Sequence, residues 1–82
     1  MFRILRSSIK QTCYGCPTQF EGKTEDGYLV YVRYRYGLLH LDISSFDEGV
    51  MVSFERRIGG MLDGILSLVD VVNNTSDWVE WV

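Results

Sequence analysis

Apolar and polar residues alternate along the middle of the chain, which is the pattern of β-strands that bury one face. The alternating segments are separated by glycine-containing turns, and they predict a four-stranded antiparallel β-meander over about residues 17–57. The apolar positions that share one face are Phe20, Val30, Val32, Tyr34, Leu39, Leu41, Ile43, Val52 and Phe54. We therefore expect a sheet with an apolar inner face and a polar outer face.

Three turns fix the register of these strands. Residues 25–27 suit a three-residue loop with Gly27 in the left-handed conformation, residues 36–37 suit a two-residue turn, and residues 46–49 suit a four-residue loop. A bulged loop is the alternative at residues 36–37, because Tyr-Gly is not the best pair for that turn. The predicted facing pairs are Phe20 with Val32, Tyr34 with Leu39, Val32 with Leu41, Val30 with Ile43, Leu41 with Phe54 and Ile43 with Val52 on the inner face, and Glu21 with Tyr31, Gln19 with Arg33 and His40 with Glu55 on the outer face.

A C-terminal helical or hairpin segment is predicted over about residues 61–82, after the break at residues 59–60. Ser67 and Asp70 match a capping box, which favours a short helix. A β-hairpin is the alternative, because the segment is rich in valine and residues 73–76 are turn-like. In the helix, the side chains expected to face the sheet are Leu68, Val69 and Val72. The predicted fold class is thus α+β, a meander with a short C-terminal helix.

The composition describes one small domain, residues 1–82. With 82 residues and 46% apolar side chains, the chain can form a single core of marginal stability. One short helix barely covers such a sheet, so we expect a homo-oligomer. No apolar run reaches the length of a membrane span, and residues 1–9 lack the apolar core of a signal peptide. We therefore expect a cytoplasmic protein with no membrane contact.

Cys13 and Cys16 form a CxxC motif before the first predicted strand. In dithiol redox sites this motif begins a helix within a βαβ unit, and the predicted strands do not provide that context. A zinc site needs four ligands, and His40 is the one further soft ligand in the sequence, so zinc is a weak alternative. Two cytoplasmic cysteines are normally reduced thiols, and we expect no cofactor.

Tyr31, Arg33 and Arg35 alternate on one predicted strand and therefore point the same way. The predicted register puts His40 beside Arg33. Guanidinium groups bind phosphate or carboxylate through two parallel hydrogen bonds, and a neighbouring tyrosine can stack on a ligand. This face is a candidate binding site for a phosphorylated small molecule or an acidic protein surface, with a solvated face of cross-strand polar pairs as the alternative. The net charge of −3 argues against nucleic acid as the partner.

His40 would need a positioned nucleophile to act as a general base. The predicted register puts no serine or cysteine beside it, so we expect no catalytic residue. The simpler interpretation is a solvated histidine that interacts with the charged side chains of Glu55 and the nearby arginines.

Trp78 and Trp81 lie near the C-terminus and should pack against the body of the protein, because exposed tryptophan is costly. They are candidates for an oligomer interface, with a packed satellite core as the alternative. Residues 1–12 carry basic and no acidic side chains, whereas residues 59–82 carry acidic and no basic ones. This asymmetry would tie the termini together, orient two copies, or leave two solvated surfaces.

The segment of residues 14–41 contains CPTQFEG, EDG and YVRYRYG, and it resembles small bacterial and phage proteins of uncharacterised function. Those proteins share a C-P-T-x-[WF]-E-G opening followed by an x-R-Y-R-x-G strand. The resemblance implies no activity for any residue, but it implies a setting in which phage proteins block a host factor or sequester a signal molecule. Together with the outer face, it leads us to expect a non-enzymatic binding protein. The alternatives are an assembly protein acting through Trp78 and Trp81, and a CxxC redox or zinc protein.

Overall fold

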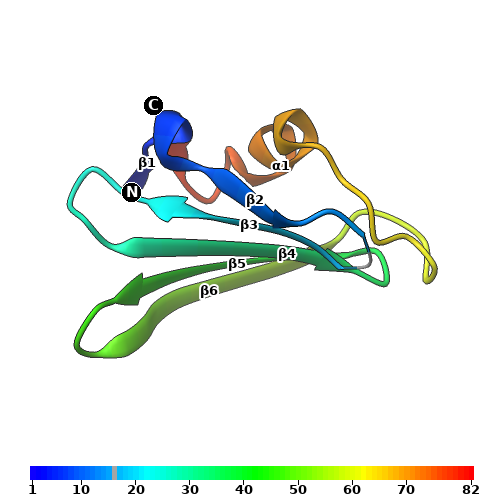
Figure 1. Cartoon of the computed structure of the whole chain (residues 1–82), viewed down its shortest axis with the longest axis horizontal. Coiled ribbons are helices and arrows are strands. Elements are labelled where there is room, and N and C mark those ends of the chain that lie inside the picture. Colours follow the sequence, from blue (N-terminus) through cyan, green and yellow to red (C-terminus); the bar gives the residue numbers. More distant parts are fainter. Residues whose placement is uncertain (16) are drawn as a thin grey trace.

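Five antiparallel strands form the main sheet of the computed structural model, which describes residues 1–15 and 17–82. They are adjacent in space in the order of the sequence (Figure 1): β2 (Lys10–Cys13), β3 (Thr18–Lys23), β4 (Leu29–Arg35), β5 (Leu38–Ser45) and β6 (Gly49–Arg57). The predicted α+β fold of an antiparallel meander with a short helix is confirmed. The predicted number of four strands is wrong, because β2 is a fifth strand that begins before residue 17.

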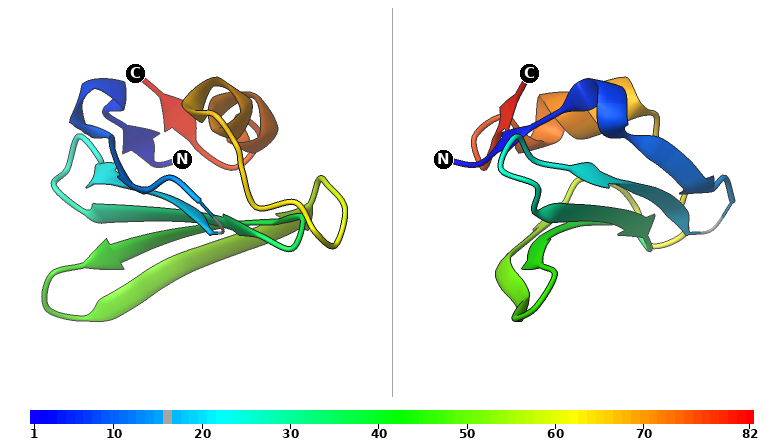
Figure 2. Two further views of the ribbon diagram at one scale, coloured as in Figure 1. Left: turned by 45° about the vertical axis from the view of Figure 1, so that its right-hand side comes forward. Right: turned by 60° about the vertical axis from the view of Figure 1, so that its left-hand side comes forward.

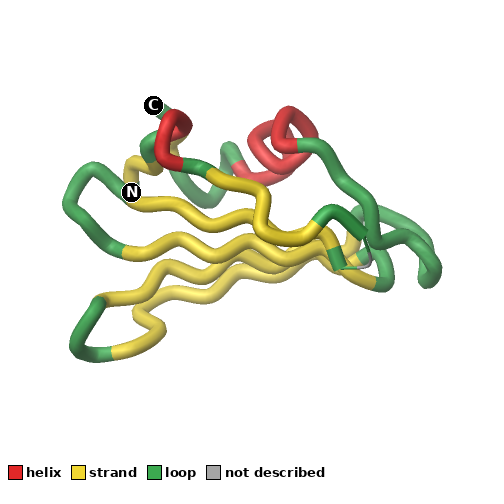
Figure 3. Tube along the Cα trace, viewed as in Figure 1, coloured by secondary structure: helices red, strands yellow, loops and turns green. Residues whose placement is uncertain are grey.

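The additional strand β2 pairs with β3 at one edge of the sheet (Figure 3). Its residues are exposed or half-buried, and its register shifts between Gln11 and Cys13. An edge strand without an apolar alternation of its own carries little periodic signal. The sequence pattern therefore could not reveal it.

The first two hairpin turns have the predicted geometry. Gly27 has a φ of 88°, and the β4–β5 turn has positive φ at both residues, 55° at Tyr36 and 74° at Gly37. Two positive φ values are the mark of a type I′ turn, so the alternative of a bulged loop at residues 36–37 is wrong. Every facing pair predicted from the turns occurs in the sheet, including His40 with Glu55 on the outer face.

Strands β5 and β6 have the predicted register, but the loop between them is shorter than predicted and a bulge compensates for the difference. Ser45 already faces Gly49, so the loop is residues 46–48, one residue shorter than predicted. A bulge then adds one residue to β6 and restores the predicted pairing of Ile43 with Val52. Ser45 Oγ accepts hydrogen bonds from two backbone N–H groups of the loop, which stabilises this tighter turn.

A second layer, formed by both ends of the chain, covers the inner face of the sheet (Figure 2). It contains β1 (Arg3–Ile4), the 3-10 turn η1 (Arg6–Ser8), α1 (Leu68–Thr75) and β7 (Glu80–Trp81). Strands β1 and β7 pair in parallel, and Ile4, Val71 and Val79 are buried against the apolar face. This pairing was not predicted, because two-residue strands at opposite ends of a chain leave no local pattern.

Helix α1 begins at the predicted capping box. Ser67 Oγ accepts a hydrogen bond from the Asp70 backbone N–H at 3.2 Å and donates to the Asp70 carboxylate at 2.9 Å. The helix, and not the hairpin, is therefore confirmed. Its predicted inner face is partly wrong: Val69 is 68% exposed, whereas Val71 and Thr75, one helical turn apart, are buried. No helix in the described part of the chain is long and apolar enough to cross a membrane.

Ion pairs and aromatic contacts hold the two ends of the chain in this layer. Arg3 Nε lies 3.1 Å from the Glu80 carboxylate, so one pair of opposite charges from the two ends of the chain does meet, at the surface. Trp81 Nε1 donates a hydrogen bond to Thr75 Oγ1 at 2.9 Å. Trp78 and Trp81 both pack against the hydrophobic core, so the predicted docking of the C-terminal segment is confirmed. A role of the two tryptophans in an oligomer interface stays a prediction.

The edge of the inner face at β6 is closed by a small polar and aromatic cluster. The Trp78 ring stacks on Phe54 with centroids 5.1 Å apart, and the Arg56 guanidinium lies 4.5 Å from the Trp78 centroid. Arg56 donates two hydrogen bonds, of 2.6 and 3.1 Å, to the Asp77 carboxylate. These bonds lower the pKa of Asp77 and raise the pKa of Arg56.

Candidate functional site

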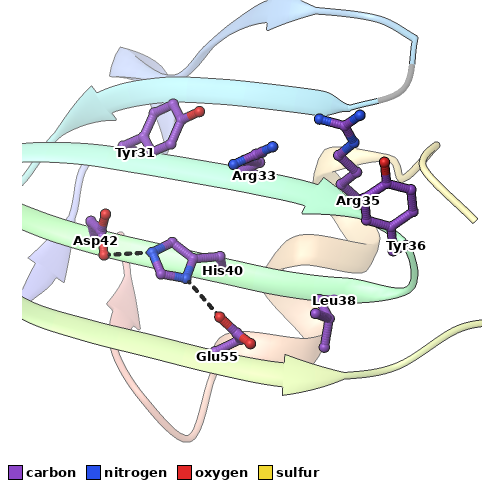
Figure 4. Close-up of a pocket in the computed structure, with 8 residues that line it drawn as sticks. All are labelled: Tyr31, Arg33, Arg35, Tyr36, Leu38, His40, Asp42 and Glu55. Atoms are coloured by element: carbon purple, nitrogen blue, oxygen red, sulfur yellow. Dashed lines mark hydrogen bonds and ion pairs between the residues drawn. The ribbon is translucent and has the colours of Figure 1, made fainter. Parts of the chain in front are cut away.

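The outer face of the sheet carries a pocket of about 370 Å³, and the second layer leaves it uncovered because that layer lies on the inner side (Figure 2). Strands β4, β5 and β6 and the β4–β5 turn supply the residues that line it (Figure 4): Tyr31, Arg33, Arg35, Tyr36, Leu38, His40, Asp42 and Glu55. All four residues of the predicted binding face thus line one pocket.

The register of the sheet explains how three strands meet at this pocket. Arg33 of β4 faces His40 of β5, and His40 faces Glu55 of β6. The neighbouring row contains Tyr31, Asp42 and Ser53. Facing residues of adjacent antiparallel strands have Cβ atoms about 4.5–5.5 Å apart. Alternation along each strand therefore concentrates these side chains on a small area of one face.

The two arginines form the basic part of the pocket. The Nε atom of Arg33 is buried and makes no hydrogen bond to any residue that the structure describes. Arg33 lies between Tyr31 and Arg35 along β4 (Figure 4). The guanidinium carbon of Arg35 lies 4.6 Å from the centre of the Tyr36 ring, within range of a cation–π interaction. Within residues 1–15 and 17–82, neither arginine forms an ion pair with a carboxylate.

The acidic part of the pocket is organised around His40. His40 Nε2 lies 2.8 Å from Asp42 Oδ1, and His40 Nδ1 lies 3.3 Å from Glu55 Oε2 (Figure 4). A carboxylate only accepts hydrogen bonds, so both contacts are satisfied together when the imidazole carries two protons. The histidine is thus held between two acids, at a fixed place directly across from Arg33.

Ser53 lies closer to His40 than the sequence predicted. Its Oγ is 3.4 Å from His40 Nε2, because diagonal neighbours on adjacent strands are within reach of each other. The expectation of no serine near His40 is therefore wrong. The geometry is still not that of an activated nucleophile, because Ser53 Oγ donates to Asp42 Oδ1 at 2.6 Å and His40 Nε2 is directed at the same oxygen. A ring nitrogen that donates to a carboxylate cannot also remove a proton from the serine.

The fold does not bring together Cys13 and His40, two of the metal candidates. Cys13, which forms no disulfide with a described residue, ends β2, and His40 lies on β5, with two strands between them. At about 4.8 Å per strand, the two residues are about 14 Å apart, which is too far for one zinc ion. Cys16 lies outside the described residues. Among the residues that are described, no group of three or more histidine, cysteine, aspartate or glutamate side chains could hold a metal ion.

Four lining residues were not named as site residues from the sequence: Tyr36, Leu38, Asp42 and Glu55. The signal for Asp42 and Glu55 was available: the predicted register put Glu55 across from His40, and alternation along the strand puts Asp42 on the same face as His40. Tyr36 was assigned to the turn alone, and the contact of its ring with Arg35 depends on side-chain conformation. The predicted strand register therefore identified more of the residues that line the pocket than the residue types alone did.

Comparison of the chain with models of protein families, with curated proteins and with solved structures found no match.

Proposed function

We propose that the protein is a non-enzymatic binding protein whose outer-face pocket binds the anionic group of a phosphorylated small molecule. The observation that carries this proposal is the pair of Arg33 and Arg35, which line the pocket and form no ion pair with a carboxylate of the described chain. A bound phosphate would supply the missing negative charge, since phosphate oxygens accept the forked hydrogen bonds of guanidinium groups.

The neighbourhood of Arg33 supports an anion rather than a neutral ligand. Arg33 and Arg35 point to the same face from positions two residues apart on β4, which separates their Cα atoms by about 6.7 Å. Long side chains from such positions can reach one phosphate together. Because neither guanidinium is paired with a carboxylate of the described chain, their charges are available to a ligand.

The size of the pocket supports a small molecule rather than an acidic protein surface. Small-molecule sites are concave and occupy about 300–1,000 Å³, a range that includes this pocket. A protein partner usually covers a broader and flatter area. The resemblance to small phage proteins adds the setting of a phage-encoded inhibitor or sponge, which would act in a host cytoplasm by sequestering a phosphorylated metabolite.

Charge reversal tests the proposal. The double variant Arg33→Glu, Arg35→Glu should lose affinity for inorganic phosphate and glycerol 3-phosphate by more than about 30-fold in calorimetric titration. The matched control, Lys10→Glu with Lys23→Glu, makes the same change in net charge at exposed positions outside the pocket and should retain binding. Circular dichroism should show both variants folded. Equal binding in the two double variants, or no binding in the wild type, would rule the proposal out.

A second candidate function is self-assembly, which is favoured by exposed large apolar side chains. Leu62 and Ile65, in the segment between β6 and α1, are 93% and 75% exposed. Large exposed apolar patches mark interaction sites, and these two side chains would contribute to one. Sedimentation of the wild type and of the variant Leu62→Glu, Ile65→Glu tests this candidate, which is discarded if the wild type is monomeric at micromolar concentration.

A further inference from the structure

The pocket has two parts of opposite charge: Arg33 and Arg35, which form no ion pair with a described residue, and the carboxylates of Asp42 and Glu55, each with one oxygen still free of hydrogen bonds to described residues. Asp42 uses only Oδ1 to accept hydrogen bonds from His40 and Ser53, and Glu55 uses only Oε2 to contact His40. Within the described part of the chain, Asp42 Oδ2 and Glu55 Oε1 have no hydrogen-bond partner. Each carboxylate oxygen is a strong acceptor, and these two belong to residues that line the pocket.

From this arrangement we infer that the ligand is a nucleoside monophosphate whose base carries an exocyclic amino group. The inference rests on the proposed function, because it uses the same arginines for the phosphate. It adds that Asp42 accepts a hydrogen bond from the amino group, and that Tyr31, which faces Asp42 directly across the sheet, stacks on the base.

The dimensions of the sheet agree with a ligand of this length. The middle of the Arg33 and Arg35 pair is about three residues along the strand from the row of Tyr31 and Asp42, and a strand rises about 3.4 Å per residue. The two binding groups are therefore about 10 Å apart. Inorganic phosphate and short phosphomonoesters can occupy only one end of such a site, whereas the phosphate and base of a mononucleotide can occupy both.

A comparison of nucleotides on the unaltered protein gives the test that does not depend on folding of a variant. AMP and IMP share the ribose and the phosphate, and they differ in an amino group or a carbonyl at position 6 of the purine. CMP and UMP provide the same contrast on a pyrimidine. The amino forms should bind at least about 10-fold more tightly in calorimetric titration, because a carboxylate that accepts from an amine repels a carbonyl.

One substitution tests whether Asp42 causes the preference for AMP over IMP. Asp42→Asn should reduce the AMP over IMP preference to less than about 3-fold, since a neutral amide can face either group. The matched control Asp47→Asn removes a carboxylate from the exposed β5–β6 loop and should leave the preference unchanged. The variant Tyr31→Ala should weaken both AMP and IMP but not inorganic phosphate.

The outcomes separate this inference from the proposed function. Equal affinity for AMP, IMP and ribose 5-phosphate, all lost in Arg33→Glu, would overturn the amino-nucleotide inference and leave the phosphate site standing. A preference for AMP that persists in Asp42→Asn would overturn the role of Asp42. Failure of every phosphate compound to bind would overturn both the inference and the proposed function.

Discussion

The two faces of the five-stranded sheet are built from the same strands, yet they differ in how their polar groups are satisfied. On the inner side, the buried hydroxyls of Thr18 on β3, of Thr24 just after β3 and of Thr75 on the covering helix α1 all take part in hydrogen bonds within the chain. On the outer face, Arg33 Nε is buried without such a bond to any described residue. Native proteins satisfy nearly all buried polar groups, so this exception needs a physical explanation. Within the described residues, the inner face pairs its buried polar groups more completely than the outer face does.

Alanine substitution of two adjacent leucines on β5 should give the largest difference in the free energy of unfolding between the two faces. Leu39 is fully buried on the inner face, whereas Leu38 lies half-buried on the outer face. Leu39→Ala should lower the free energy of unfolding by about 2–5 kcal/mol, because it leaves a cavity in the core. Leu38→Ala should lower it by less than about 1 kcal/mol. Urea denaturation measures both, and similar losses would show that the outer face is as tightly packed as the core.

A buried hydrogen bond on the inner face provides the next largest effect. Thr18 Oγ1 donates to the Gly64 carbonyl at 2.6 Å and accepts from the Leu66 N–H at 3.3 Å, which anchors the segment before α1 to β3. Thr18→Val leaves the carbonyl unpaired and should cost about 1–3 kcal/mol of the free energy of unfolding. The control Thr12→Val changes an exposed residue of β2 and should cost much less in the same denaturation experiment. A Thr18→Val protein as stable as the wild type would contradict this account of the inner face.

Two arginines test the contrast between satisfied and unsatisfied groups directly. Arg33→Met should leave the free energy of unfolding unchanged or raise it by up to about 1 kcal/mol, because it removes a side chain whose buried Nε has no hydrogen bond to any described residue. The same variant should lose phosphate binding. Arg56→Met removes a guanidinium that is bonded to Asp77 and Asn74, and it should lower stability without affecting phosphate binding. A large loss of stability in Arg33→Met would show that Arg33 serves the fold.

The meander could be predicted from the sequence because the residues that determine each strand pairing are close together in the sequence. Each hairpin register depends on a turn and on the residues that flank it, and the inner and outer faces then follow from alternation. At the β5–β6 connection, two deviations compensated each other: the loop is shorter than predicted, and a bulge in β6 restores the register. The prediction of Ile43 facing Val52 was therefore right although the predicted loop was wrong.

The second layer could not be predicted because its contacts join residues that are distant in sequence. Strands β1 and β7 are two residues long and pair across almost the whole chain, so neither has a period to detect. For the pocket, alternation was enough to place Tyr31, Arg33, Arg35 and His40 on one face. The hydrogen bonds that distinguish a satisfied side chain from an unsatisfied one depend on side-chain conformations, which no sequence pattern gives. The sequence therefore could not predict that Arg33 Nε makes no hydrogen bond to any described residue.

The smallest expected effect concerns the acid stability of the inner face at the β6 edge. The hydrogen bonds from Arg56 lower the pKa of Asp77 below its usual value of 3.8, so the folded protein binds fewer protons there than the unfolded chain. The resulting stabilisation is present above about pH 4 and is lost as the pH falls through the lowered pKa. Denaturation of the wild type and Asp77→Asn should therefore give a difference in free energy of unfolding that is constant near neutral pH and shrinks below pH 3.8. The control Asp47→Asn alters an exposed loop and should follow the wild type. A difference between wild type and Asp77→Asn that does not change with pH would show that the Arg56 bonds act equally on both protonation forms of Asp77.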